Sequence, residues 1–239
     1  MIEAVTFDVW NTLLEIRTFL NEVAKHLSKL INKPVYEVSE LVFRAFLRTK
    51  KAHLHGVFDD ERVVEQSLEF MSKQMKIDEI EVLHKAFKLA TESVDPSEIV
   101  IKGVEKILSE IKALGLKRAI IGNVVIWPGD YTRFLLKRAN LDRYFSVQLY
   151  ADEVRCSKPN KEIFTRALSE LGIENPEKAV HIGDSLYEDF VGAILSRMKA
   201  ILIDYKQDRI IEIGNGLAFI VPNINTVIKV IRRVGFKTS

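Results

Sequence analysis

The chain has 239 residues, 47% of them hydrophobic and 28% charged, which suits one large domain or one domain with a smaller domain inserted into it. Its 35 basic and 33 acidic residues leave a net charge of +2 and no clustered basic surface of the kind that binds nucleic acids. The single cysteine, Cys156, excludes an internal disulfide. No secretory leader pattern opens the chain, and no apolar run could span a bilayer. We therefore expect a soluble cytoplasmic protein with no membrane or nucleic-acid partner.

The first third of the chain turns from a strand into a run of helices. Residues 2–8 are apolar and β-branched and predict a buried strand. Apolar residues then recur at helical spacing, which predicts helices over residues 17–31, 36–51, 63–75 and 80–90. Asp95 and Pro96 are typical of a linker, so we expect an all-helical insert over residues 15–95. The insert carries basic residues that suit either an exposed helix face or the steering of an anionic substrate, namely Arg17, Arg44, Arg48, Lys50 and Lys51.

The rest of the chain alternates between strand and helix patterns. Strands are predicted at residues 118–122, 147–150, 179–182, 200–203 and 217–221. Helices are predicted at residues 102–114, 129–139, 160–171, 186–196 and 224–234. Strands that alternate with helices form a parallel sheet, so the fold class we expect is a doubly wound α/β core over residues 1–14 and 96–239.

Polar side chains follow several of these strands at the point where each strand ends. They are those of Asp8, Asn123 (which follows Gly122), Lys158, Asp184 and Asp189. In an open α/β sheet, ligands bind beyond the carboxyl ends of the strands, so we expect these side chains along one edge of the sheet. Mg²⁺ takes oxygen ligands from one or two carboxylates and from substrate phosphates, and a carboxylate can also act as a nucleophile that forms an aspartyl-phosphate. The pattern therefore indicates a Mg²⁺ site that holds a phosphate group.

The order of these motifs resembles that of the haloacid dehalogenase (HAD) superfamily. Residues 8–14 are similar to the first motif of the superfamily and Asn123 to the second, while Lys158-Pro159 resembles the third and residues 183–189 the fourth. The resemblance covers the whole chain, because the helical insert lies where a subclass I cap lies, between the first two motifs. It implies a Rossmann-like core with a mobile helical cap.

The resemblance also implies catalytic and metal-binding roles. Asp8 would be the nucleophile, and Lys158 would neutralise both Asp8 and the transferring phosphoryl group. The Mg²⁺ ligands would be Asp8, the main-chain carbonyl of Trp10 and Asp184. Asp189 would bind the metal ion through water or orient its ligands.

Substrate binding would fall to Thr12, Gly122 and Asn123. Thr12 would fix the loop after the nucleophile, and Asn123 with neighbouring backbone N–H groups would bind phosphate oxygens. The second motif usually contains a serine or threonine, which Gly122-Asn123 lacks. Superfamily phosphatases also carry an aspartate general acid two residues after the nucleophile, where this chain has Trp10. Loss of a positioned general acid lowers rates by about 10²- to 10⁴-fold, so we expect a preference for good leaving groups such as aryl or acyl phosphates.

Three functions remain open on this evidence. The first is a Mg²⁺-dependent phosphatase, monomeric or homodimeric, that acts on a small phosphorylated metabolite, and this is our prediction. The second is a metal-independent 2-haloacid dehalogenase, since those enzymes have an aromatic residue at the position of Trp10, but they replace the carboxylate of Asp184 by a neutral group. The third is a weakly catalytic binding or regulatory protein that keeps the fold.

Overall fold

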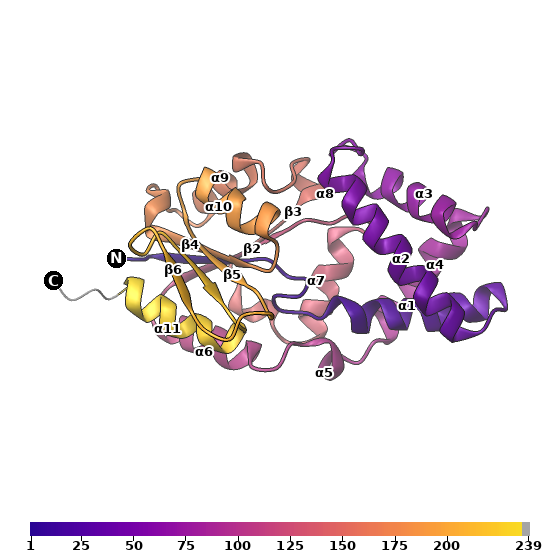
Figure 1. Cartoon of the computed structure of the whole chain (residues 1–239), viewed down its shortest axis with the longest axis horizontal. Coiled ribbons are helices and arrows are strands. Elements are labelled where there is room, and N and C mark those ends of the chain that lie inside the picture. Colours follow the sequence, from indigo (N-terminus) through magenta and orange to yellow (C-terminus); the bar gives the residue numbers. More distant parts are fainter. Residues whose placement is uncertain (236–239) are drawn as a thin grey trace.

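Residues 1–235, which the computed structural model describes, form a seven-stranded sheet with helices on both faces and a four-helix body beyond one of its ends (Figure 1). The strands are β1 (Ala4–Phe7), β2 (Lys117–Gly122), β3 (Val147–Tyr150), β4 (Ala179–Gly183), β5 (Lys199–Ile203), β6 (Ile211–Ile213) and β7 (Ala218–Val221). They lie in the order β3-β2-β1-β4-β5-β7-β6, and neighbouring strands are parallel except β6 and β7. The doubly wound α/β fold predicted from the sequence is confirmed, with β6 as an antiparallel strand at its edge.

Strand β1 lies near the middle of the sheet because its residues are buried on both faces. Val5 and Phe7 pack into the larger apolar cluster of the protein, while Ala4, on the opposite face, packs into the smaller one. Strands that are covered on both faces have nearly continuous apolar sequences, as this one does. Because β1 pairs with β2 on one side and with β4 on the other, Asp8 comes to the middle of the carboxyl edge.

Helices cover both faces of the sheet. On one face α6 (Val104–Ala113) packs against α11 (Ile224–Gly235), and on the other α9 (Lys161–Glu170) packs against α10 (Gly192–Leu195) (Figure 1). The remaining helical segments of this part of the chain are α5 (Pro96–Ile99), α7 (Gly129–Arg138), α8 (Ala151–Val154), a π-helix over Leu186–Val191 and two single 3₁₀ turns. None of the helices within residues 1–235 combines the length and the apolar composition that a bilayer crossing requires.

Four further helices form the insert between β1 and β2. They are α1 (Ile16–Ile31), α2 (Val35–Leu54), α3 (Val63–Met75) and α4 (Ile80–Ser93). The two connections to the sheet run side by side, because Glu15 N donates to Ile99 O at 2.8 Å and Ile101 N donates to Leu13 O at 3.0 Å. The insert therefore joins the sheet through one hydrogen-bonded pair of segments, directly after the loop that follows Asp8.

Besides the short helices α5 and α8, which were not predicted, two local details differ from the predicted elements. Residues 186–196 were predicted as one helix but form the π-helix followed by α10. The prediction missed the π-helix because apolar spacing does not distinguish i→i+5 from i→i+4 hydrogen bonding. Strand β6 was not predicted, because it has only three residues, with Glu212 at its centre, and lies at the edge of the sheet. Neither difference moves the strand ends that carry the polar side chains.

Candidate active site

The sheet brings the predicted site residues together at its carboxyl edge. Phe7 lies opposite Ile120 of β2 and Ile182 of β4, so these three strands end within two residues of one another along the edge. The cavity at this edge is lined by Asp8, Trp10, Asn123, Asp184 and Asp189 and by Ile16, Phe46, Lys50, Val125, Trp127 and Glu188. The motifs that are far apart in the sequence therefore share one site.

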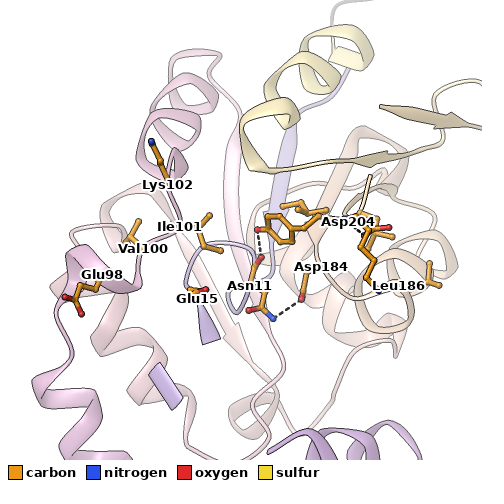
Figure 2. Close-up of a pocket in the computed structure, with 13 residues that line it drawn as sticks. Asn11, Glu15, Glu98, Val100, Ile101, Lys102, Asp184, Leu186 and Asp204 are labelled. Carbon is orange, nitrogen blue, oxygen red and sulfur yellow. Dashed lines mark hydrogen bonds between the residues drawn. The ribbon is translucent and has the colours of Figure 1, made fainter. Parts of the chain in front are cut away.

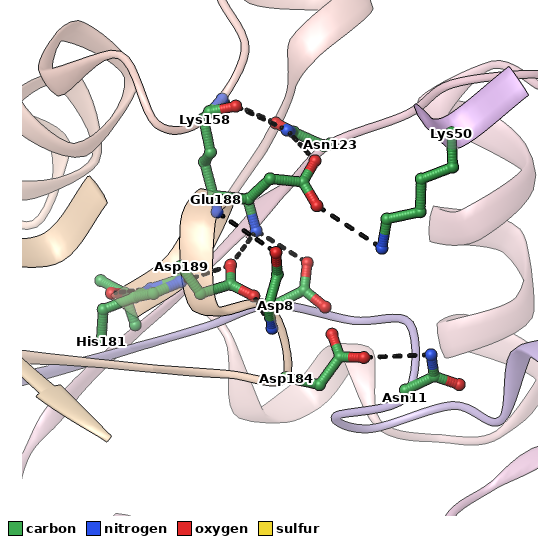
Figure 3. A network of polar contacts seen from close by, with 11 residues as sticks. Asp8, Asn11, Lys50, Asn123, Lys158, His181, Asp184, Glu188 and Asp189 are labelled. Atoms are coloured by element: carbon green, nitrogen blue, oxygen red, sulfur yellow. Dashed lines mark hydrogen bonds and ion pairs between the residues drawn. The ribbon is translucent and has the colours of Figure 1, made fainter. Parts of the chain in front are cut away.

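Lys158 is a buried ammonium between two buried carboxylates (Figure 3). Its Nζ lies 2.7 Å from Asp8 Oδ1 and 2.6 Å from Asp189 Oδ1. Burial alone would lower the pKa of Lys158, but the two carboxylates outweigh it and raise the pKa above the usual lysine range. Lys158 is thus a fixed positive charge beside the proposed nucleophile.

Asp189 is held by more than the lysine. Its Oδ1 is 3.0 Å from His181 Nε2, and its Oδ2 accepts from Ser185 N at 2.9 Å. His181 Nδ1 is in turn 2.8 Å from Thr6 Oγ1, its partner across the β1–β4 pair. Burial would raise the pKa of Asp189, but Lys158 and His181 outweigh it and hold the pKa well below the usual range. Asp189 therefore stays ionised and fixes the position of the Lys158 ammonium.

Asp8 and Asp184 are short of positive charge. One carboxylate oxygen each from Asp8, Asp184 and Asp189 lies within 4.8 Å of the other two. Burial, which the neighbouring carboxylates reinforce, raises the pKa of Asp8 to about 7 and that of Asp184 to about 6. Three oxygen donors that repel one another are the donor set that a hard divalent cation such as Mg²⁺ prefers. The residues present therefore fit the metal site that the sequence predicted.

Asn123 holds the loop that carries Lys158. Its Nδ2 donates to Lys158 O at 2.9 Å and to Glu188 Oε1 at 2.7 Å, and its Oδ1 accepts from Lys158 N at 2.8 Å. Both amide hydrogens are thus engaged within the protein. Gly122 lies so close to Tyr150 that a Cβ would come within 2.8 Å of its ring. Thr12 is fully buried, and its hydroxyl has no hydrogen-bond partner within residues 1–235.

Trp10 forms part of an apolar wall. Its ring centroid is 5.1 Å from that of Phe19 and 5.2 Å from that of Trp127, and Phe46 stacks on Trp127 at 6.2 Å. The cavity has a volume of about 40 Å³, which is room for only one or two waters. The insert therefore closes over the carboxylates in this structure.

A larger cavity opens on the other side of the loop after β1 (Figure 2). It has a volume of about 730 Å³ and is lined in part by Asn11, Lys102, Asp184 and Asp204. Asn11 Nδ2 donates to Asp184 Oδ2 at 3.1 Å. Because Asp184 lines both cavities, this carboxylate can be reached from solvent without opening the smaller one.

Three residues of the site were given no role in it from the sequence, namely His181, Thr6 and Glu188. Two of them left a signal, because Thr6 and His181 are polar residues in strands that are otherwise apolar and buried. Glu188 lies one residue before Asp189, and only the course of the π-helix shows that both carboxylates line the cavity.

A methyl group on Gly183 would collide with the carboxylate of Asp189. A Cβ at this position would lie 2.2 Å from Asp189 Cγ. We expect Gly183→Ala to displace Asp189 and to lower the free energy of unfolding by about 1–3 kcal/mol, measured by urea denaturation. Gly235→Ala is the control, since a methyl group there meets nothing within 4 Å. Equal stability of the two variants would contradict this prediction.

A model of the haloacid dehalogenase-like hydrolase family matches residues 2–195. The chain belongs to this family. A HAD-like relative, haloacid dehalogenase-like hydrolase domain-containing protein 3 of Xenopus laevis, is 26% identical over 216 residues, which cover 86% of this chain and 85% of that protein. Phosphoserine phosphatase of Thermus thermophilus is 35% identical over 100 residues, 42% of this chain and 39% of that one. The crystal structure of a HAD phosphatase from Thermococcus onnurineus superposes with a TM-score of 0.63 at 25% identity, covering 96% of this chain and 98% of that one.

Membership in the HAD-like family makes the protein a hydrolase but leaves the reaction open. Several relatives at low identity are phosphatases, whereas solved structures with the same fold include dehalogenases. The choice between the two reactions therefore depends on the residues of the site.

Proposed function

We propose that this HAD-like hydrolase is a Mg²⁺-dependent phosphatase that acts on a small phosphorylated metabolite through an aspartyl-phosphate on Asp8. The observation that carries the proposal is the pair of carboxylates, Asp8 and Asp184, that share the cavity. Without a cation, Asp8 has a pKa of about 7 and is partly protonated near neutral pH, which makes it a poor nucleophile. A dehalogenase that works without a metal ion has no use for Asp184.

The residues divide the work of phosphoryl transfer between them. One oxygen of Asp8 attacks phosphorus, and water later hydrolyses the aspartyl-phosphate. The Lys158 ammonium neutralises negative charge on the transferring group, with Asp189 and Asn123 fixing its head and its backbone. Because both amide hydrogens of Asn123 are engaged, phosphate binding on this side falls to backbone N–H groups of the loop after Gly122.

The metal ion would be held by Asp8, Asp184 and the main-chain carbonyl of Trp10, with Asp189 acting through water. When bound, Mg²⁺ would supply charge neutralisation for the phosphate. Asp189 suits an indirect role, since Lys158, His181 and Ser185 already occupy its oxygens.

The test of the proposed function is hydrolysis of p-nitrophenyl phosphate, whose leaving group needs no proton. We expect turnover with Mg²⁺ and a loss of at least about 100-fold on chelation with EDTA, because Asp8 and Asp184 then lack their shared cation. Turnover of 2-chloropropionate without metal would instead establish a dehalogenase. Absence of both activities would favour a weakly catalytic binding or regulatory protein.

Metal binding should depend on pH in a stated direction. Protons compete with Mg²⁺ for Asp8 and Asp184, whose pKa values are raised to about 7 and about 6. The affinity should therefore increase as the pH rises through these values and level off above them. Titration calorimetry with Mg²⁺ at pH 5.5, 6.5 and 8.0 measures this, and an affinity that is constant over the range would contradict it.

A further inference from the structure

The closed cavity contains one charged side chain that comes from the insert. Among the described residues that line it, the insert contributes Ile16, Phe46 and Lys50, of which the first two are apolar. Lys50 lies on α2, and its Nζ is 3.5 Å from Glu188 Oε2. In Figure 3 its ammonium enters from the side opposite Lys158, with Asp8 between the two.

This placement matters for the geometry of phosphoryl transfer. The attacking and leaving oxygens lie roughly in line on opposite sides of phosphorus. Asp8 attacks from the carboxyl edge of the sheet, and the insert lies beyond that edge (Figure 1). The leaving oxygen therefore points toward the insert, on the side from which Lys50 enters.

Among the described residues that the insert contributes to the cavity lining, none is a carboxylic acid or a histidine that could act as a general acid. Trp10 has no proton of suitable acidity, and its indole is packed against Phe19 and Trp127. Burial would lower the pKa of Lys50, but Glu188 and Asp184 outweigh it and raise the pKa, so the side chain stays an ammonium. It can therefore offer charge to an oxygen more readily than it can give up a proton.

We propose that Lys50 is a catalytic residue that stabilises the leaving oxygen as an oxyanion, in place of the acid absent at Trp10. This inference rests on the proposed phosphatase function. As the bond from Asp8 to phosphorus forms, the bond from phosphorus to the leaving oxygen breaks, and the electron pair stays on that oxygen. The oxyanion pairs with the Lys50 ammonium and takes its proton from water after release.

Glu188 is the positioning residue in this arrangement. One of its oxygens faces Lys50 at 3.5 Å, and the other accepts from Asn123 Nδ2 at 2.7 Å. Asn123 also bonds the backbone of Lys158 on both its N–H and its carbonyl. Glu188 therefore fixes the position of the Lys50 ammonium relative to the loop that carries Lys158.

The experiment compares substrates that differ in how much help the leaving oxygen needs. kcat/KM is measured for p-nitrophenyl, phenyl and ethyl phosphate with Mg²⁺, on wild type, Lys50→Met and Lys50→Arg. We expect Lys50→Met to lose less than about 5-fold on p-nitrophenyl phosphate but about 100-fold on phenyl phosphate, the usual effect of removing one oxyanion donor. Lys50→Arg, which keeps the charge, should retain most of the activity on all three.

Controls separate this role from a structural one. Lys51→Met alters the exposed neighbour on the same helix and should leave every rate unchanged. Trp10 and Trp127 are the two tryptophans of the chain and both line the cavity, so an unchanged fluorescence spectrum of Lys50→Met shows that the cavity is intact. An equal loss on all three phosphates would overturn the inference and leave the phosphatase standing. Lack of wild-type turnover on any phosphate would instead overturn the proposed function.

Discussion

Replacing Asp8 by asparagine is expected to lower turnover of p-nitrophenyl phosphate by at least about 10⁴-fold, because the variant loses the carboxylate nucleophile that Lys158 contacts at 2.7 Å. The amide has nearly the shape of the carboxylate, so the apolar packing of β1 should persist. Steady-state rates with Mg²⁺ measure the loss. Residual turnover within tenfold of wild type would contradict the assignment of Asp8 as nucleophile.

Asp204→Asn is the matched control for this variant. Asp204 also follows a strand, β5, at the same edge of the sheet, but it accepts from Lys206 N and Gln207 Nε2 and does not line the closed cavity. Its replacement should leave the rate unchanged. A similar loss in both variants would mean that any change of charge at this edge disturbs the site.

Asp8→Asn should stabilise the metal-free protein above neutral pH. The pKa of Asp8 is raised from 3.8 to about 7 in the folded chain. At pH values between these two, the folded state still binds a proton that the unfolded state has released. Ionised Asp8 therefore destabilises the fold at pH 8, and asparagine removes that penalty. The melting temperature of Asp8→Asn should exceed that of wild type at pH 8, and the difference should shrink as the pH falls below 7.

The sequence predicted the site as far as the parallel sheet determines it. Asp8, Asn123 and Asp184 each directly follow a strand, and neighbouring parallel strands bring their carboxyl ends to one edge. Lys158 is reached through a longer loop, and only the motif order indicated its place. The contacts that fix these side chains are long-range, such as the pairing of Thr6 with His181, and no local pattern predicts them.

Lys50 shows where prediction from the sequence stops. It was one of five basic residues of the insert, and an exposed helix face explained all of them equally well. Which of them reaches the cavity depends on how the aromatic cluster of Phe19, Phe46 and Trp127 seats the insert on the sheet. That packing joins residues about one hundred positions apart, so spacing within α2 could not reveal it.

Lys158→Met should be the most damaging of these substitutions for stability, and it should also lower activity. It leaves Asp8 and Asp189, both buried, without the ammonium that lies 2.7 Å and 2.6 Å from them. Removing one partner of a buried ion pair typically costs about 3–5 kcal/mol, because the remaining charge is uncompensated. We also expect turnover to fall by at least about 10³-fold, since charge on the transferring group is no longer neutralised. Urea denaturation at pH 8 and steady-state kinetics measure the two effects.

The surface pair of Lys178 and Glu3 is the control for the stability loss expected of Lys158→Met. Its atoms are 2.8 Å apart, nearly as close as those of the buried pairs, but both side chains are 47% exposed. Lys178→Met should therefore change stability by less than about 1 kcal/mol. Lys158 lowers the pKa of Asp8, so without it Asp8 takes up a proton already above pH 7, and the penalty of Lys158→Met should decrease as the pH falls toward 7 and level off below it. If Lys158→Met were as mild as Lys178→Met at pH 8, the buried charges would not be the element that organises this site.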